Sequence, residues 1–117
     1  MSEIKLRSYT SAERKAAPVH TGVMLYFPDA LMAVARLSKK ANDKHNPGEP
    51  LHWSREKSSD HGDCVARHML APDEVDTETG ETELTATAWR SLAQLQLAEE
   101  KRLVSLGIKP LSGVVKA

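Results

Sequence analysis

The chain has 117 residues, 40% of them hydrophobic, so it can bury one modest core and fold as one small domain. Its 16 Lys and Arg residues balance 16 Asp and Glu residues, which excludes a strongly basic nucleic-acid coat and an acidic tail protein. The zero net charge conceals a segregation, because residues 71–100 carry eight acidic side chains and a single basic one. This acidic block must be solvated, paired in space with basic segments, or occupied by a cation.

The cellular compartment is indicated by three features that the sequence lacks: a second cysteine, a membrane span and a signal peptide. A lone cysteine, Cys64, excludes an intrachain disulfide and favours a reducing compartment. No apolar run approaches the length of a membrane span, and the first five residues contain no signal-peptide core. We therefore expect a soluble cytoplasmic protein.

The first half of the chain predicts one helix after a polar lead-in. Residues 1–20 are polar, basic and weakly patterned. Pro28 suits the first turn of a helix and Asp29 complements its positive end. Apolar residues at helical spacing then predict an amphipathic helix over 28–43, which ends before the Asn46-Pro47-Gly48 turn.

A second helix is predicted after the turn-rich segment. Ser58 or Ser59 can cap it, with Asp60 in its first turn, and its apolar side continues until Pro72. Residues 73–83 then read as an acidic loop with a turn at Thr79-Gly80.

The last predicted helix, over 82–104, is long and apolar on two flanks. One row comprises Leu84, Ala88, Leu92 and Leu95, and the other Trp89, Ala93 and Gln96. Because both flanks need neighbours in so short a chain, we expect a homo-oligomer formed by helix packing. The fold expected is all-α: a small bundle of three main helices completed by oligomerisation. Its divisions are a basic N-terminal lead-in (1–20), a helical domain (21–106) and a C-terminal tail (107–117).

Side chains that can take part in catalysis or ligand binding are concentrated between residues 45 and 68, where four of the five histidines lie. Asp60 and Asp63 are three residues apart and project from adjacent positions of one helix face, which suits two carboxylates holding a divalent cation. The alternative is a surface ion pair between Asp63 and Arg67.

The neighbouring side chains leave similar alternatives open. His61, Cys64 and His68 share a face, but a structural zinc site needs four ligands and the chain has no second cysteine. Trp53 is either a core aromatic or a stacking platform for a base. Arg55, Lys57 and Arg67 are either solvated charges or contacts for metal-bound phosphates.

Most familiar enzyme classes are excluded by missing motifs. The sequence has no Walker motif, no dinucleotide-binding glycine fingerprint, no nucleophile elbow and no zinc-finger spacing.

A resemblance to a known family rests on short sequence words in the family's order and close to its spacing, over about residues 22–100. The words are Phe27-Pro-Asp-Ala-Leu31, Asn42-Asp-Lys-His-Asn-Pro-Gly48, Leu51-His-Trp-Ser-Arg55, Lys57-Ser-Ser-Asp60 with Asp63, Arg67-His68, and Ala88-Trp-Arg-Ser-Leu-Ala-Gln-Leu-Gln96. They resemble the phage-encoded dATP/dGTP diphosphohydrolase N-terminal domain, which is similar in chemistry and helical character to the MazG-like nucleotide pyrophosphohydrolases.

The resemblance implies an all-α, MazG-like enzyme. It would cleave a purine deoxynucleoside triphosphate, dGTP or dATP, to the monophosphate and pyrophosphate in phage nucleotide metabolism, in the host cytoplasm if phage-encoded. The implied cofactor is Mg²⁺, with Mn²⁺ as a substitute. The implied partners are the small-molecule nucleotide and further copies of the chain, and neither a nucleic-acid polymer nor a membrane.

The resemblance also implies roles for individual residues. The metal ligands that the resemblance implies are Asp60 and Asp63, with His68 as an orienting group beside them in the catalytic site. Asp76 and Glu83 are added as metal ligands because we interpret part of the acidic block over 71–100 as a cation-binding wall. The implied substrate contacts are Arg55, Lys57 and Arg67 for the phosphates and Asn46, His52 and Trp53 for the base or sugar.

One position departs from the family pattern. Glu83 stands where a histidine is expected at the start of the last helix, after a longer acidic turn. It either supplies an oxygen ligand or marks the loss of catalysis. The alternative function is therefore a catalytically inactive helical module that binds a nucleotide or a protein.

Overall fold

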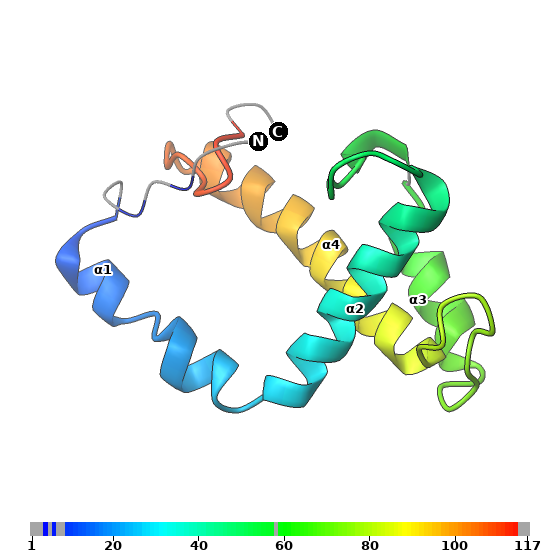
Figure 1. Cartoon of the computed structure of the whole chain (residues 1–117). Helices are drawn as coiled ribbons and strands as arrows, with labels where there is room; N and C mark the ends of the chain where they lie inside the picture. The colour runs from blue at the N-terminus through cyan, green and yellow to red at the C-terminus, as the bar shows by residue number, and fades with distance from the viewer. Residues whose placement is uncertain (1–3, 5, 7–8, 58, 115–117) are drawn as a thin grey trace. The chain divides into compact units, whose positions relative to one another are not determined.

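The structure is a computed structural model and describes residues 4, 6, 9–57 and 59–114. The described residues form helices and no strand, so the predicted all-α fold is confirmed (Figure 1). The elements in chain order are α1 (Ser11–Lys15), the π-helix η2 (His20–Met24), α2 (Pro28–His45), the 3-10 helix η3 (Arg55–Lys57), α3 (His61–Met69) and α4 (Glu83–Ser105). Among the described residues, no helix combines the length and the apolar character that crossing a membrane requires.

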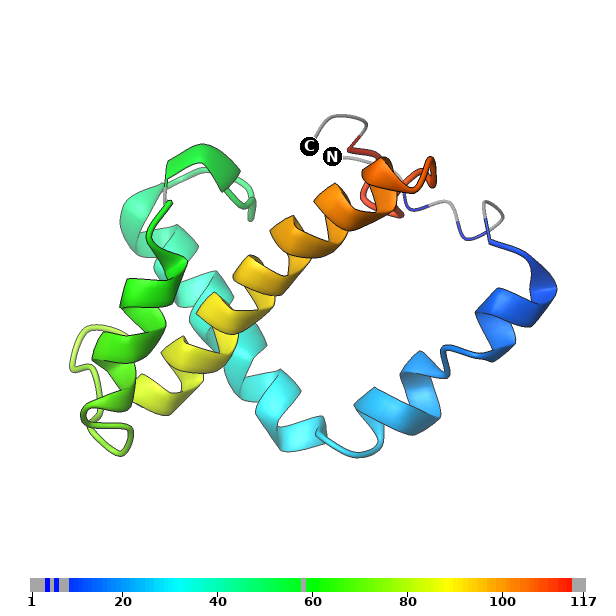
Figure 2. The ribbon, with the colours of Figure 1, turned by 180° about the vertical axis from the view of Figure 1, so that it is seen from behind.

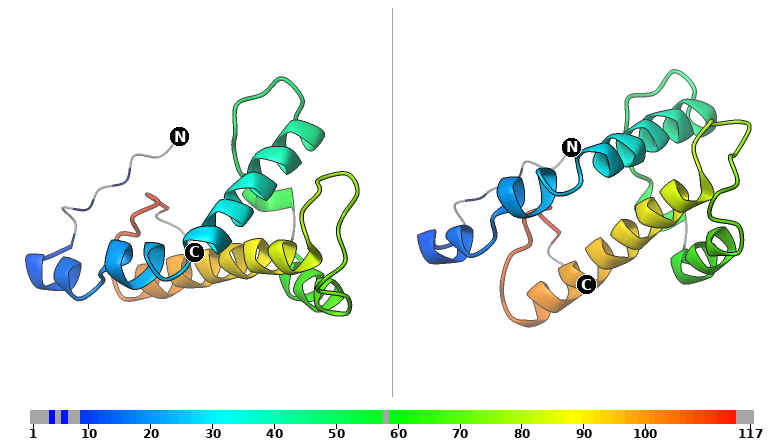
Figure 3. Two further views of the ribbon diagram at one scale, coloured as in Figure 1. Left: turned by 60° about the horizontal axis from the view of Figure 1, so that its bottom comes forward. Right: turned by 90° about the horizontal axis from the view of Figure 1, so that it is seen from below.

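The chain divides into two compact units. One comprises Pro28–Gln94, and the other comprises Met1–Phe27 with Leu95–Ala117. Within the unit Pro28–Gln94, α2 crosses the first half of α4 and α3 lies beside the beginning of α4, as Figure 2 shows from behind. A loop, yellow-green in Figure 3, connects α3 to α4.

The N-terminal region contains a helix that the weak patterning did not predict. Thr10 caps α1 reciprocally with Glu13: the Glu13 amide donates to Thr10 Oγ1 at 3.1 Å, and the Thr10 amide donates to Glu13 Oε1 at 2.8 Å. These bonds lower the pKa of Glu13 below its ordinary value, with the backbone bond from Thr10 as the largest cause. The basic lead-in over 1–20 thus includes a short helix at residues 11–15, which a capping box stabilises.

Helix α2 confirms the predicted amphipathic helix and continues two residues further, to His45. Asp29 lies in its first turn, where a carboxylate favours the positive end of the helix. The chain leaves the helix through Gly48, whose φ of 80° is readily adopted only by glycine. The Asn46-Pro47-Gly48 turn thus ends α2 as the sequence predicted.

Helix α3 begins later than predicted. Asp60 is its N-cap rather than a first-turn residue, and its side chain makes no capping hydrogen bond. Ser58, one of the two predicted caps, lies outside the described residues. The helix ends at Met69, before Pro72, and buries His61 and Cys64.

Helix α4 confirms the predicted long helix over 82–104 within one residue at each end. Gly107 ends it with φ 75°, and the Ile108 amide reaches back to the Leu103 carbonyl at 2.9 Å, a Schellman arrangement. Only one flank is covered by the chain's own residues: Ala93 is 5% exposed, whereas Leu92 on the other flank is 51% exposed. In the single chain, the flank that carries Leu92 is therefore not packed.

Candidate functional site

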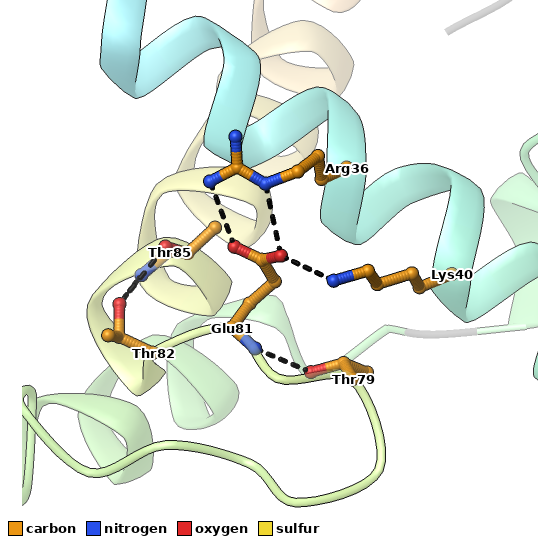
Figure 4. Close-up of polar contacts among 6 residues, drawn as sticks. All are labelled: Arg36, Lys40, Thr79, Glu81, Thr82 and Thr85. Carbon is orange, nitrogen blue, oxygen red and sulfur yellow. Dashed lines mark hydrogen bonds and ion pairs between the residues drawn. The ribbon is translucent and has the colours of Figure 1, made fainter.

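The acidic loop between α3 and α4 is bound to α2 by ion pairs. Glu81, which is 7% exposed, accepts hydrogen bonds from Arg36 at 3.2 and 3.3 Å and from Lys40 at 2.7 Å (Figure 4). Outside Figure 4, Lys44 forms an ion pair with Glu78. Because Arg36, Lys40 and Lys44 follow one another at single turns of α2, one helix face neutralises two carboxylates of the acidic block.

The same bonds act on the ionisation of Glu81. The hydrogen bonds from Arg36, then those from Lys40, lower the pKa of Glu81 below its ordinary value and outweigh the opposing effect of burial. At neutral pH this carboxylate is therefore ionised and already paired. Of the three alternatives for the acidic block, pairing in space with basic residues applies to Glu78 and Glu81.

Asp76, a predicted metal ligand, is occupied within the loop. Its carboxylate accepts the amide of Glu78 at 2.8 Å, and its backbone carbonyl accepts the amide of Gly80 at 2.7 Å. The Asp76 amide in turn donates to the Glu81 carbonyl at 2.9 Å. Gly80 has φ 75°, as this turn requires. The predicted turn at Thr79-Gly80 is present, and Asp76 is one of its main stabilising residues.

Glu83, a further predicted metal ligand, is engaged by a histidine. It is the first residue of α4, and its Oε2 contacts Nδ1 of His68 from α3. The contact joins two predicted site residues that are 15 positions apart in the sequence. It orients the His68 imidazole through Nδ1 and leaves Nε2 as the ring nitrogen open to other contacts.

Asp60 and Asp63 remain as exposed carboxylates at the start of α3. Neither side chain has a hydrogen bond or ion pair with another described residue. Arg67 donates to Cys64 Sγ at 3.2 Å and forms no ion pair with Asp63 in the described part of the chain. The surface-pair alternative for Asp63 is therefore not what the structure shows.

The predicted set of metal ligands is not assembled as a whole. Within residues 4, 6, 9–57 and 59–114, no group of three or more His, Cys, Asp or Glu side chains is arranged to hold a metal ion. Asp76 and Glu83 have other partners, whereas Asp60 and Asp63 have none in the part of the chain that the structure describes. Mg²⁺ in proteins is commonly held by one or two carboxylates, with waters and substrate phosphates as its other ligands.

The segment after α2 is organised by one buried amide. Asn42, 5% exposed, accepts hydrogen bonds at Oδ1 from the Asn46 side chain at 3.2 Å and the His52 amide at 3.4 Å. Its Nδ2 donates to the Glu49 carbonyl at 3.3 Å. Two predicted substrate contacts, Asn46 and His52, are therefore brought together around a residue that the sequence did not single out as a site residue.

Trp53 lies in an aromatic and cationic cluster. Its ring meets that of Trp89 edge-to-face, with centroids 6.0 Å apart, and the Arg55 guanidinium lies over Trp53 at 4.6 Å. Arg90, beside Trp89, places Nη1 3.2 Å from His61 Nδ1. Trp53 is thus both packed and partly exposed, so its two proposed roles are compatible.

Lys57 and Arg67 lie on either side of the aspartate pair along the chain. Lys57 is exposed at the end of η3, and Arg67 is exposed in the last turn of α3. Both can reach solvent anions, although one donor of Arg67 is used by Cys64.

Sequence reasoning did not identify the supporting residues Asn42, Glu81 and Arg90 as part of the site. Trp89 was read only as a packing residue of the last helix. Trp89 and Arg90 interrupt an alanine-rich stretch of α4, and this local feature of the sequence could have identified them. Nothing local marks Asn42 or Glu81, since their partners come from other elements.

Comparison with known proteins agrees with the sequence words. The family model described as dATP/dGTP diphosphohydrolase, N-terminal, matches residues 10–105, which is more than half of the chain. No curated protein and no solved structure shows a significant match. The match includes every predicted site residue, from Asn46 to Glu83, and extends beyond the words on both sides. The chain therefore belongs to the dATP/dGTP diphosphohydrolase N-terminal family.

Proposed function

We propose that the protein hydrolyses a purine deoxynucleoside triphosphate, dGTP or dATP, to the monophosphate and pyrophosphate with Mg²⁺. The observation that carries the proposal is a pair of exposed carboxylates, Asp60 and Asp63, which have no partner among the described residues and lie at the start of α3 in a family named for this activity. Asp60 occupies an N-cap position without capping the helix. A cap residue normally uses its side chain to satisfy a helix amide, so this carboxylate is available for another role.

In this proposal, Asp60 and Asp63 hold the cation. When bound there, Mg²⁺ would supply positive charge beside the triphosphate oxygens and would lower the pKa of an attacking water. Water adds to the α-phosphorus, the bond from that phosphorus to the α–β bridging oxygen breaks, and pyrophosphate leaves. Lys57 and Arg67 offset charge on the departing phosphates.

The remaining residues position these groups and the nucleoside. Glu83 holds His68, whose ring orientation is thereby fixed between α3 and α4. Asn42 orders the segment that carries Asn46 and His52, the proposed base or sugar contacts. Trp53 supplies an aromatic surface on which the base can stack.

The test is an assay of each deoxynucleoside triphosphate with Mg²⁺, with Mn²⁺ in parallel, in which monophosphate and pyrophosphate are separated by anion-exchange chromatography. We expect turnover of dGTP or dATP and a loss for Asp63→Asn that exceeds the roughly 10–100-fold typical of outer-shell changes. Asp43→Asn is the matched control, because Asp43 is an exposed carboxylate bonded to Lys39 on α2. Absence of turnover with every nucleotide would refute the proposal.

A second candidate function is metal-independent nucleotide binding without catalysis. It is favoured by the absence of a group of three potential metal ligands among the described residues. A rise in melting temperature with dGTP that needs no metal and persists in Asp63→Asn, without turnover, would support this alternative.

A further inference from the structure

The start of α3 lacks a side-chain cap. Asp60 is the N-cap residue, and its carboxylate accepts no hydrogen bond from an amide of the helix. The first turn is closed by the backbone alone, through the Cys64 amide, which donates to the Asp60 carbonyl at 3.0 Å. Because α3 has only nine residues and a short helix depends on packing for its stability, its uncapped end needs a contact with another element.

Arg90 of α4 supplies that contact. Helix α3 lies beside the beginning of α4 (Figure 2), and Nη1 of Arg90 lies 3.2 Å from Nδ1 of His61, the first residue of α3. The guanidinium also lies over the ring of Trp89, with Cζ 5.7 Å from the ring centroid, which restrains it from its own helix. Arg90 therefore connects α4 to the buried residue that directly follows Asp60.

The histidine in this contact is costly for stability. Nε2 of His61 is buried and has no hydrogen-bond partner among the described residues. Burying a polar atom without a partner destabilises a fold. A leucine would occupy this covered position without an unpaired polar atom, just as the apolar Cys64 occupies the next turn of the same face. Stability alone therefore does not account for the imidazole, and the contact with Arg90 is what a leucine would lose.

We propose that Arg90 is a positioning residue of the candidate site, which holds Asp60 and Asp63 in place through His61. The inference rests on the proposed function in one respect, since it takes these two carboxylates as the metal ligands. Both lie within two positions of His61 in the chain, so a displacement of His61 moves both. Carboxylates bind a cation well only when the residues around them fix their geometry. Arg90 acts through His61 and touches neither the cation nor the nucleotide.

The first test measures metal binding to the full chain without nucleotide, by titration with Mn²⁺ and detection of the free ion by electron paramagnetic resonance. Arg90→Met keeps a long side chain without donors and should raise the dissociation constant of Mn²⁺ at least about tenfold. Arg90→Lys keeps a donor for Nδ1 and should restore part of the affinity. Gln94→Met is the matched control, because Gln94 lies one turn further along α4 and its Nε2 would be 3.8 Å from a methyl group added at Gly62. It should leave Mn²⁺ binding unchanged.

A second variant separates positioning from stability and remains decisive if circular dichroism shows that Arg90→Met does not fold. His61→Leu removes the acceptor of the contact together with the unpaired Nε2. It should weaken Mn²⁺ binding as much as Arg90→Met does, with a melting temperature no lower than that of the wild type. In the His61→Leu background, Arg90→Met should have no further effect on Mn²⁺ binding.

The outcomes distinguish this inference from the proposed hydrolysis. Wild-type affinity for Mn²⁺ in folded Arg90→Met, or in His61→Leu, would overturn the role of Arg90 and leave the hydrolysis untouched. A further loss when Arg90→Met is added to His61→Leu would overturn it as well, because Arg90 would then act without His61. A wild type that neither binds Mn²⁺ nor hydrolyses dGTP or dATP would refute the proposed hydrolysis and this role together.

Discussion

Arg36 bonds both carboxylate oxygens of Glu81, its Nη2 to Oε1 at 3.3 Å and its Nε to Oε2 at 3.2 Å. This two-point contact has the planar geometry that distinguishes arginine from lysine. It joins α2 to the last residues of the acidic loop, just before α4 begins. The loop is therefore fixed at the end that leads into α4, close to Glu83, the first residue of that helix.

Glu81→Gln should lower the melting temperature at pH 7 by at least about 2 °C, because Arg36 and Lys40 lose their ionised partner. Thermal unfolding followed by circular dichroism measures the shift. Glu78→Gln is the control: Glu78 and Lys44 are both exposed, so their ion pair should contribute less than half as much.

The contribution of Glu81 should depend on pH in a defined direction. Its pKa in the folded protein lies below the ordinary value of 4.5. Its stabilising effect is therefore fully present above about pH 4.5 and is lost as pH falls through the lowered folded pKa. The melting temperatures of the wild type and Glu81→Gln should converge in acid, and a difference that stays constant below pH 4 would contradict this account.

Asn42→Ala should destabilise the protein by about 1–3 kcal/mol, since it removes three hydrogen bonds of a buried amide. Urea denaturation gives this free energy. Asn46→Ala removes only one of these bonds and should cost less. If the assay detects hydrolysis, Asn42→Ala should also raise KM, because Asn46 and His52 lose their common partner. Equal costs for the two alanine variants would argue against Asn42 as the organising residue.

The edge-to-face pair of Trp53 and Trp89 should show an energetic coupling of about 0.5–1.5 kcal/mol in a double-mutant cycle with leucine. Chemical denaturation of the two single variants and the double variant supplies the values. A control cycle that combines Trp53→Leu with Leu70→Ala, at a residue 86% exposed, should show additive effects. Additive effects in both cycles would mean that each ring stabilises the protein through its own burial and that the contact between the rings adds nothing.

Two glycines should respond to alanine in opposite directions. Gly62 lies in α3 with its nearest non-local atom 3.8 Å from an added methyl group, so Gly62→Ala should stabilise the protein by about 0.5–1 kcal/mol. Gly80 has φ 75°, and Gly80→Ala should cost about 1–2 kcal/mol. Melting temperatures that move in the same direction for both variants would contradict the backbone conformations described.

The sequence predicted the main helices because their signals are local. Pro28 and Asp29 mark the start of α2, and Gly107 marks the end of α4. The start of α3 was misplaced because neighbouring serine and aspartate residues can all act as N-caps. Helix α1 was missed although its signal, Thr10 followed by Glu13, was present in the sequence.

The candidate site was less predictable because partners far apart in the sequence decide the role of each charge. Glu81 pairs with a residue 45 positions earlier, and Glu83 contacts His68, 15 positions earlier. No periodicity or spacing rule identifies such partners. The carboxylates of Asp60 and Asp63, which are adjacent on one helix, were recognised because their relation is local.

The contact between Arg90 and His61 determines where the imidazole carries its hydrogen. A guanidinium has no acceptor atom, so Nδ1 of His61 must accept and the hydrogen lies on Nε2. That Nε2 is buried and has no hydrogen-bond partner. Its N–H should therefore exchange slowly with solvent and be visible as a ring resonance in nitrogen-15 spectra. The histidines between residues 45 and 68 therefore have different surroundings: His61 is a fixed tautomer inside the fold, while His68 contacts the carboxylate of Glu83.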